Sequence, residues 1–142
     1  MPSTNQSIVV NASVDEVWTR FRNFHDLSWA SNVIANVEKV GDVDGGSVGA
    51  KRLLNGVFHE TLVEIDDDAY FLRYSIDDGP SPVSRDEVSN YIGIVKLSSV
   101  EQGGQTLVEW TSAWDSDSED AVEFCHGIYA ALLGALVESF EH

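Results

Sequence analysis

Apolar and polar positions near the N-terminus follow a strand pattern and then a helical one. Residues 6–10 predict a short β-strand. Ser13 and Glu16 then stand at the positions of a capping box, which opens a helix. Apolar residues at spacings of three and four predict one buried helix face that continues to about residue 24: Val14, Val17, Trp18, Phe21 and Phe24. Residues 25–29 predict a second, short helix.

From residue 33 to residue 114 the pattern is typical of β-strands separated by turns. Turn-forming runs such as Asp44-Gly45-Gly46 and Asp78-Gly79-Pro80 divide the segment. Short turns between consecutive strands favour an antiparallel meander. We predict six strands, at about 33–41, 48–54, 57–65, 70–77, 88–99 and 105–114.

The C-terminal segment predicts one long helix. The serine-rich acidic run at residues 115–120 offers capping groups and negative charge for a helix N-terminus, so we expect the helix from about residue 117. Its apolar stripe is wider than packing on a flat sheet requires: Val122, Phe124, Cys125, Ile128, Tyr129, Leu132, Leu133, Leu136, Val137 and Phe140. The chain is therefore predicted to be an α+β protein whose curved sheet wraps this helix, and a cavity between the two suits a small apolar molecule.

Length and charge restrict the possible partners. A chain of 142 residues fits a single domain, 1–142. The formal net charge of −16 disfavours nucleic acids and anionic membrane surfaces. No secretory signal and no apolar run of membrane-spanning length is apparent, so we expect a cytoplasmic protein without stable membrane insertion, as a monomer or homodimer. The lone Cys125 excludes an internal disulfide.

Four short motifs, taken in order, resemble one known superfamily. They are Val14-Asp15-Glu16-Val17-Trp18, Gly49-Ala50-Lys51-Arg52, His59-Glu60-Thr61-Leu62 and Asn90-Tyr91. Together they are similar to the START-like (SRPBCC) superfamily, which contains polyketide cyclases/dehydrases, pollen allergens, abscisic-acid receptors and lachrymatory-factor synthase. The resemblance implies a helix-grip fold, in which a curved seven-stranded antiparallel sheet surrounds a long C-terminal helix. It also implies an internal cavity that binds a polyketide-, lipid- or hormone-like molecule.

The resemblance also suggests site residues. Positions similar to Glu60, Tyr91, Glu109, Phe124 and Ile128 line the hormone pocket of the plant receptors. In the synthase, the catalytic arginine, glutamate and tyrosine are similar to Arg52, Glu60 and Tyr91. A carboxyl group buried in an apolar cavity can exchange protons near neutral pH, so these three residues could perform acid–base chemistry without a cofactor.

Face alternation, helical spacing and the resemblance together predict the lining of the cavity. The predicted lining is Trp29, Leu54, Phe58, Glu60, Leu62, Tyr74, Ile76, Tyr91, Glu109, Thr111, Phe124, Ile128 and Leu132. No metal site is expected, because His59-Glu60 is followed by Val63 where a zinc-protease motif has its second histidine.

Three alternatives stay open at this stage. Arg52 and Glu60, on adjacent strands, could form a structural ion pair instead of a catalytic centre. Trp110 and Trp114 share one strand face and Glu109 shares the other with Thr111, and periodicity does not tell which face meets the ligand. The same pocket would also serve a non-catalytic lipid carrier or a ligand sensor.

Overall fold

The N-terminal elements follow the predicted order with shorter helices. The computed structural model describes residues 2–100 and 104–141. It begins with β1 (Ser3–Val10), α1 (Val14–Phe21) and a 3-10 helix, η1 (Ser28–Ala30). The Ser13 hydroxyl accepts a hydrogen bond from the Glu16 backbone N–H at 3.3 Å, which confirms the predicted start of α1. The helix ends at Phe21 instead of continuing to residue 24.

Six further strands complete one antiparallel sheet. They are β2 (Val37–Val40), β3 (Lys51–Leu54), β4 (Phe58–Asp66), β5 (Phe71–Asp78), β6 (Ser89–Val100) and β7 (Gln105–Asp115). The strand order is β1-β7-β6-β5-β4-β3-β2, so β1 and β2 form opposite edges. The first two predicted meander strands are shortened. Val33 and Ile34 donate backbone hydrogen bonds to Ala30 in the turn after η1, and Gly49 adopts a φ of 97° that interrupts residues 48–50.

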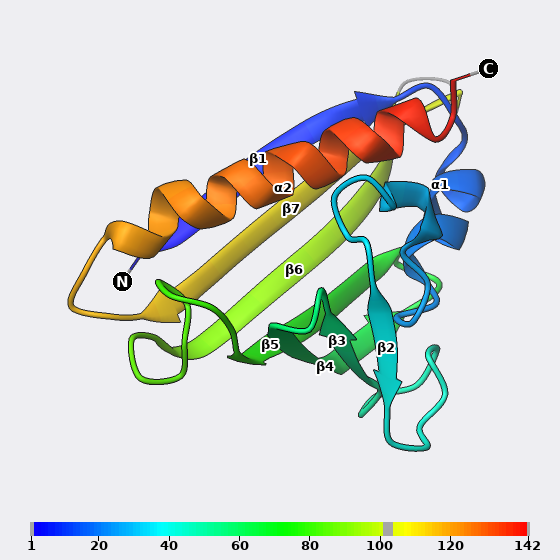
Figure 1. Ribbon diagram of the computed structural model, residues 1–142. Helices are drawn as coiled ribbons and strands as arrows, with labels where there is room; N and C mark the ends of the chain where they lie inside the picture. Colours follow the sequence, from blue (N-terminus) through cyan, green and yellow to red (C-terminus); the bar gives the residue numbers. More distant parts are fainter. Residues whose placement is uncertain (1, 101–103, 142) are drawn as a thin grey trace.

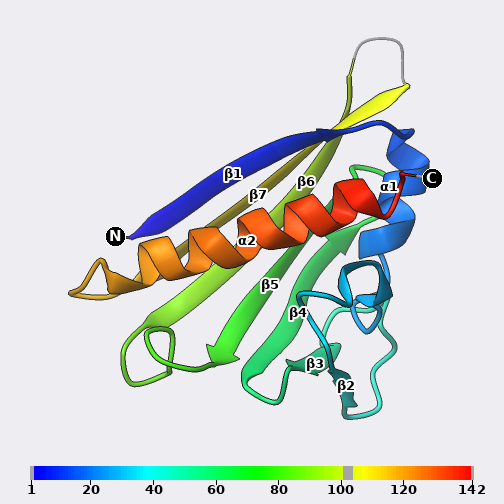
Figure 2. The same ribbon diagram turned by 45° about the horizontal axis from the view of Figure 1, so that its top comes forward.

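The long helix α2 (Asp120–Glu138) runs lengthwise over the concave face of the sheet, and α1 lies near its C-terminal end (Figures 1 and 2). Arg20 of α1 contacts this end of the chain, because its guanidinium lies 4.1 Å from the centre of the Phe140 ring. The helix begins at Asp120, later than predicted. Serine hydroxyls rather than carboxylates accept the first backbone hydrogen bonds, and the Ser118 hydroxyl accepts from the Asp120 N–H at 3.0 Å.

By length and composition, α2 is the one helix among the described residues that could cross a membrane. The expectation that no apolar run reaches such a length is therefore corrected. The apolar character of α2 comes partly from a side that packs on the sheet, and partly from small residues on its exposed side, namely Gly127, Ala130 and Ala131. The core helix of a globular protein can have the same length and composition, and α2 buries seven of its residues: Ala121, Cys125, Tyr129, Leu132, Leu133, Ala135 and Leu136.

Side chains that point inward from β5, β6 and β7 build the core beneath α2. Trp110 and Trp114 are buried there, and the parallel rings of Tyr91 and Trp114 stack with their centres 5.0 Å apart. Tyr74 lies directly opposite Gly93 in the pairing of β5 with β6. A Cβ atom at Gly93 would lie only 2.3 Å from Cζ of Tyr74, so the tyrosine ring occupies space that any other residue would need.

We predict that Gly93→Ala lowers the free energy of unfolding by about 1–3 kcal/mol, because the added methyl group overpacks against a ring that is itself fully buried. Gly127→Ala is the matched control. No atom lies within 4 Å of a Cβ built at this exposed helical position, so the substitution should stabilise the protein by about 0.5–1 kcal/mol. Urea denaturation measures both changes, and equal stability of the two variants would contradict the packing described for Tyr74.

Candidate functional site

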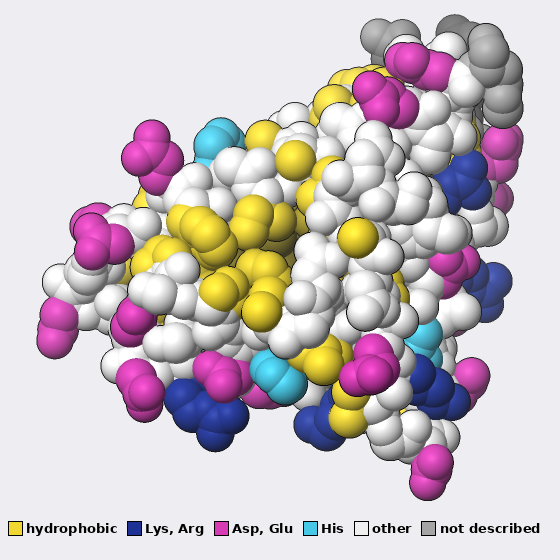
Figure 3. All heavy atoms as spheres, in the orientation of Figure 1, with side chains coloured by type: hydrophobic (Ala, Val, Ile, Leu, Met, Phe, Trp, Pro, Cys, Tyr) yellow, Lys and Arg dark blue, Asp and Glu magenta, His cyan; other side chains and the backbone are white. Residues whose placement is uncertain are grey.

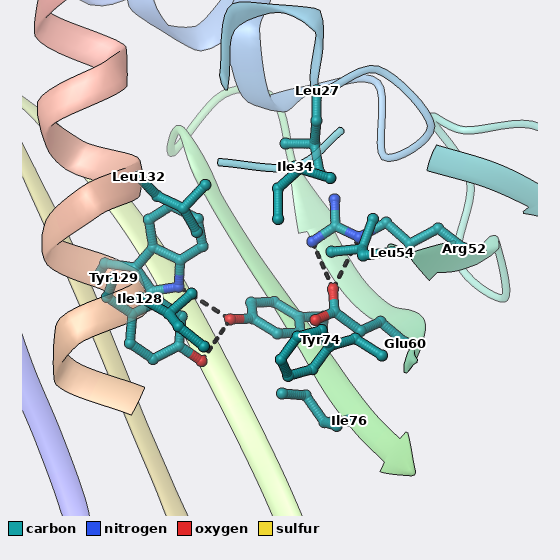
Figure 4. A pocket seen from close by; sticks show the side chains of 12 residues that line it. Leu27, Ile34, Arg52, Leu54, Glu60, Tyr74, Ile76, Ile128, Tyr129 and Leu132 are labelled. Atoms are coloured by element: carbon teal, nitrogen blue, oxygen red, sulfur yellow. Dashed lines mark hydrogen bonds and ion pairs between the residues drawn. The ribbon is translucent and has the colours of Figure 1, made fainter. Parts of the chain in front are cut away.

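A small pocket lies between α2 and the sheet, at the side of β3, β4 and β5. Its volume is about 30 Å³. Such a volume holds one or two water molecules, whereas pockets for drug-sized ligands measure roughly 300–1,000 Å³. The lining is Leu27, Ile34, Arg52, Leu54, Phe58, Glu60, Tyr74, Ile76, Trp110, Ile128, Tyr129 and Leu132. Figure 4 shows the polar pair Arg52 and Glu60 on one side and Ile128 and Leu132 of α2 on the other.

Arg52 and Glu60 form a buried ion pair in this pocket. The residues are direct partners in the pairing of β3 with β4, which brings their side chains together on one face of the sheet. Arg52 Nη2 lies 2.6 Å from Glu60 Oε1, and Arg52 Nε donates to the same oxygen at 2.8 Å. Arg52 Nη1 donates to the Phe24 carbonyl oxygen at 3.1 Å, and the guanidinium lies 3.7 Å from the centre of the Phe24 ring. All three guanidinium nitrogens therefore have partners.

The second carboxylate oxygen of Glu60 is left for the pocket. No hydrogen bond to Oε2 is found within residues 2–100 and 104–141, and Figure 4 shows this oxygen pointing toward the pocket interior. Burial raises the pKa of Glu60 above its ordinary value near 4.5, while the positive charge of Arg52 opposes the increase. Glu60 is thus a hydrogen-bond acceptor whose charge the apolar surroundings disfavour.

Three tyrosine hydroxyls form a chain beside this pair. The Tyr129 hydroxyl lies 2.8 Å from that of Tyr74 and 2.5 Å from that of Tyr91. The indole Nε1 of Trp110 donates to the Tyr74 hydroxyl at 3.0 Å. Burial raises the pKa of all three tyrosines, so they stay protonated at neutral pH. The chain ties α2 to β5, β6 and β7.

Apolar side chains surround the opening of the pocket. Figure 3 shows hydrophobic side chains gathered in a hollow beside the first half of α2. Four residues at this position are only partly buried: Phe58, Ile76, Phe124 and Ile128. Phe58 of β4 and Phe124 of α2 stack with ring centres 6.5 Å apart, so they bridge the gap between the sheet and the helix.

Most residues predicted for the site do lie at this pocket. The residues that line it as expected are Arg52, Leu54, Phe58, Glu60, Tyr74, Ile76, Ile128 and Leu132. Tyr91 does not line it but reaches it through the hydroxyl of Tyr129. Phe124 stands at the edge, against Phe58.

Four predicted lining residues lie elsewhere. Glu109 and Thr111 point to the outer face of β7, because the alternation of that strand turns Trp110 and Trp114 inward. The expected inward position of Glu109 is therefore wrong, and the face that carries Trp110 and Trp114 is the inward one. Trp29 packs on the Phe21 ring, and its indole nitrogen donates to the Arg20 carbonyl. Leu62 is fully buried in the core.

Four lining residues were not predicted. Trp110 belonged to the strand face that the resemblance placed outside, and Tyr129 was identified only as part of the apolar stripe of α2. Leu27 and Ile34 lie on either side of η1, outside any regular strand or helix. Periodicity carries no information on the direction of side chains in such segments, so only the tertiary structure shows that they reach the pocket.

The sequence model of the family "Polyketide cyclase / dehydrase and lipid transport" matches residues 1–141. The chain belongs to this family. No curated protein matches the sequence.

Several solved structures resemble this member of the family. A Nitrosospira multiformis protein is 47% identical, with a TM-score of 0.95 and coverage of 98% of this chain and 96% of that chain. An uncharacterized protein from Bacillus thuringiensis is 26% identical, with a TM-score of 0.80 and coverage of 99% of both chains. Norcoclaurine synthase from Thalictrum flavum, in complex with dopamine and hydroxybenzaldehyde, is 16% identical, with a TM-score of 0.74 and coverage of 96% and 84%. This last similarity extends to the fold alone and confirms the predicted helix-grip architecture.

The raised pKa of Glu60 gives a testable pH dependence. Because the folded protein holds the Glu60 proton more tightly than the unfolded chain does, ionisation of Glu60 opposes folding. The stability that protonated Glu60 contributes is fully present below the ordinary pKa near 4.5. It is lost as the pH rises through the higher pKa that Glu60 has in the folded protein. We expect the free energy of unfolding of the wild type, minus that of Glu60→Gln, to fall as the pH rises from about 4 toward 7.

Urea denaturation over that pH range measures the difference, in which the other titrating groups cancel. An increase of this difference with pH would mean that Arg52 lowers the pKa of Glu60 more than burial raises it.

Proposed function

We propose that this protein binds a hydrophobic small molecule between α2 and the sheet, with the ligand in contact with the Arg52–Glu60 pair. The observation that carries the proposal is a buried carboxyl group that binds Arg52 through one oxygen and keeps the other oxygen free inside an otherwise apolar pocket. A buried carboxylate is costly to desolvate, and a purely structural ion pair would be more stable with every oxygen satisfied. Membership of a family of ligand-binding and lipid-transport proteins supports the same proposal.

A ligand larger than a few atoms requires the walls to move apart. The stacked pair Phe58 and Phe124 stands where this is easiest, because both rings are only partly buried and come from different elements. Rotation of the two rings away from each other would extend the cavity toward the hollow beside α2 (Figure 3). We further propose action in the cytoplasm as a monomer or homodimer, which suits an acidic chain whose single cysteine is buried.

A substitution that fills the pocket should abolish ligand binding. We expect Ile128→Trp to weaken binding of the neutral fluorescent probe N-phenyl-1-naphthylamine by at least about tenfold, because the indole would occupy the space between α2 and β5. Ala130→Trp is the control, since residue 130 lies on the exposed side of the same helix. Fluorescence titration gives both dissociation constants. Equal affinity of the two variants would place the probe outside this pocket.

A second candidate function is acid–base catalysis on the bound molecule. The specific observation in its favour is the direction of the Glu60 pKa, which burial raises, because a carboxyl group with a raised pKa holds a proton more readily and can return it to a substrate. A tyrosine hydroxyl of the chain could stabilise a developing oxyanion by giving up its hydrogen bond to the neighbouring tyrosine. No cofactor enters this scheme. A carrier or ligand sensor would use the same pocket without any turnover.

Native mass spectrometry of protein purified from its own host would identify a copurifying molecule by its mass. With that molecule as substrate, Glu60→Gln distinguishes the two functions. A catalyst should lose at least about 100-fold in kcat, the usual contribution of a general acid or base, and still bind the ligand. A carrier should show a change of affinity alone.

A further inference from the structure

We propose that the pocket selects an uncharged apolar molecule that carries a hydroxyl group or another neutral hydrogen-bond donor, and that it discriminates against carboxylates. This inference rests on the proposed function, because it concerns the ligand of the same pocket. It follows from the charges and free hydrogen-bonding positions of the lining residues.

Positive charge at the lining of the pocket comes from one arginine. Arg52 is the only lysine or arginine among the residues that line the pocket. Its three guanidinium nitrogens contact Glu60 or the Phe24 carbonyl, and its flat face lies on the Phe24 ring. A carboxylate that entered would therefore find only a cation whose charge Glu60 already balances, which compensates poorly for the lost hydration.

The hydrogen-bond acceptor that remains for a ligand is the second carboxylate oxygen of Glu60. Glu60 Oε2 points into the pocket, and no partner for it is found among the described residues (Figure 4). A ligand oxygen carrying a proton would donate to it and form a charge-assisted hydrogen bond. A ligand carboxylate at the same place would bring two negative charges together, and the nearby carboxylate of Asp77 adds to that repulsion.

The tyrosine hydroxyl groups near Glu60 already have hydrogen-bond partners. Tyr74 and Tyr129 also line the pocket, but their hydroxyls already join each other, Tyr91 and the indole of Trp110. They are held in the chain that fastens α2 to the sheet. Glu60 Oε2 is thus the hydrogen-bond acceptor left to orient a ligand among the described lining residues, and most of the remaining lining is apolar, which suits a hydrocarbon body.

Three naphthalene derivatives of nearly the same shape test the inference: 2-naphthylmethanol, 2-naphthoate and 2-methylnaphthalene. Amide chemical-shift changes in NMR spectra at pH 7.5 report where each binds and with what dissociation constant. We expect the wild type to bind the alcohol at least about tenfold more tightly than the carboxylate, which corresponds to about 1.4 kcal/mol. Equal or tighter binding of the carboxylate would overturn the inference.

Glu60→Gln should reverse the discrimination. It removes the negative charge and leaves Arg52 unpaired, so we expect 2-naphthoate to bind this variant about tenfold more tightly than it binds the wild type. An unchanged affinity for 2-naphthoate would contradict the assigned role of the ion pair.

Glu60→Gln leaves a buried charge unpaired and could unfold the chain, so a second variant removes both charges. In the double variant Arg52→Met and Glu60→Met, binding of the alcohol should weaken about tenfold, while binding of 2-methylnaphthalene should change less than about threefold. Equal weakening of both ligands would overturn the inference. If none of the three ligands shifts the pocket resonances of the wild type, the proposed function itself fails, a result distinct from wrong discrimination.

Discussion

The structure depends on burial of the apolar side of α2 in the concave face of the sheet. The buried stripe of the helix includes Cys125, Tyr129, Leu132 and Leu136. The sheet reaches around the helix because seven antiparallel strands run from β1 at one edge to β2 at the other, with the turn of the chain through α1 and η1 closing one end. The site exists because this packing is incomplete on the side of β3, β4 and β5.

A buried ion pair at that place needs a physical explanation. Replacement of such a pair by apolar residues is often neutral or stabilising, so stability alone does not account for Arg52 and Glu60. Their geometry is asymmetric, since Arg52 binds one carboxylate oxygen with two nitrogens and leaves the other oxygen to the pocket. The tyrosine chain, in contrast, satisfies its own hydroxyls and holds the helix in register with the strands. The two polar clusters therefore differ in role. The Arg52–Glu60 pair offers an oxygen to a ligand, and the tyrosine chain stabilises the fold.

The family and the fold leave the chemistry open. Members of one fold bind and transform unrelated molecules, and function is determined by the few polar groups inside the pocket. Norcoclaurine synthase has the same architecture at 16% identity, so its reaction does not transfer to this chain. In this pocket those groups are an arginine paired through its guanidinium and a glutamate with one free oxygen, and no other lining residue is a lysine or an arginine.

Much of the fold could be predicted because it follows from local patterns of apolar, polar and capping residues along the chain. Alternation predicted the strands, the capping residues at Ser13 and Glu16 predicted the start of α1, and the wide stripe of α2 predicted a helix enclosed by a curved sheet. The pairing of adjacent strands was also enough to bring Arg52 opposite Glu60. These features depend on residues close together in sequence or on neighbouring strands, where period and register are strong constraints.

Other features were decided by tertiary structure. Alternation divides β7 into two faces but does not say which face is inward, and packing against Phe21 and Tyr129 turned Trp110 inward and Glu109 outward. The irregular segments around η1 have no period, so Leu27 and Ile34 reached the pocket through long-range packing alone. The sequence by itself determined the elements and their order, because those follow from local periodicity. Only the three-dimensional packing determined the small volume of the pocket and the free oxygen of Glu60, because both depend on how side chains from several elements meet, which strand register does not specify.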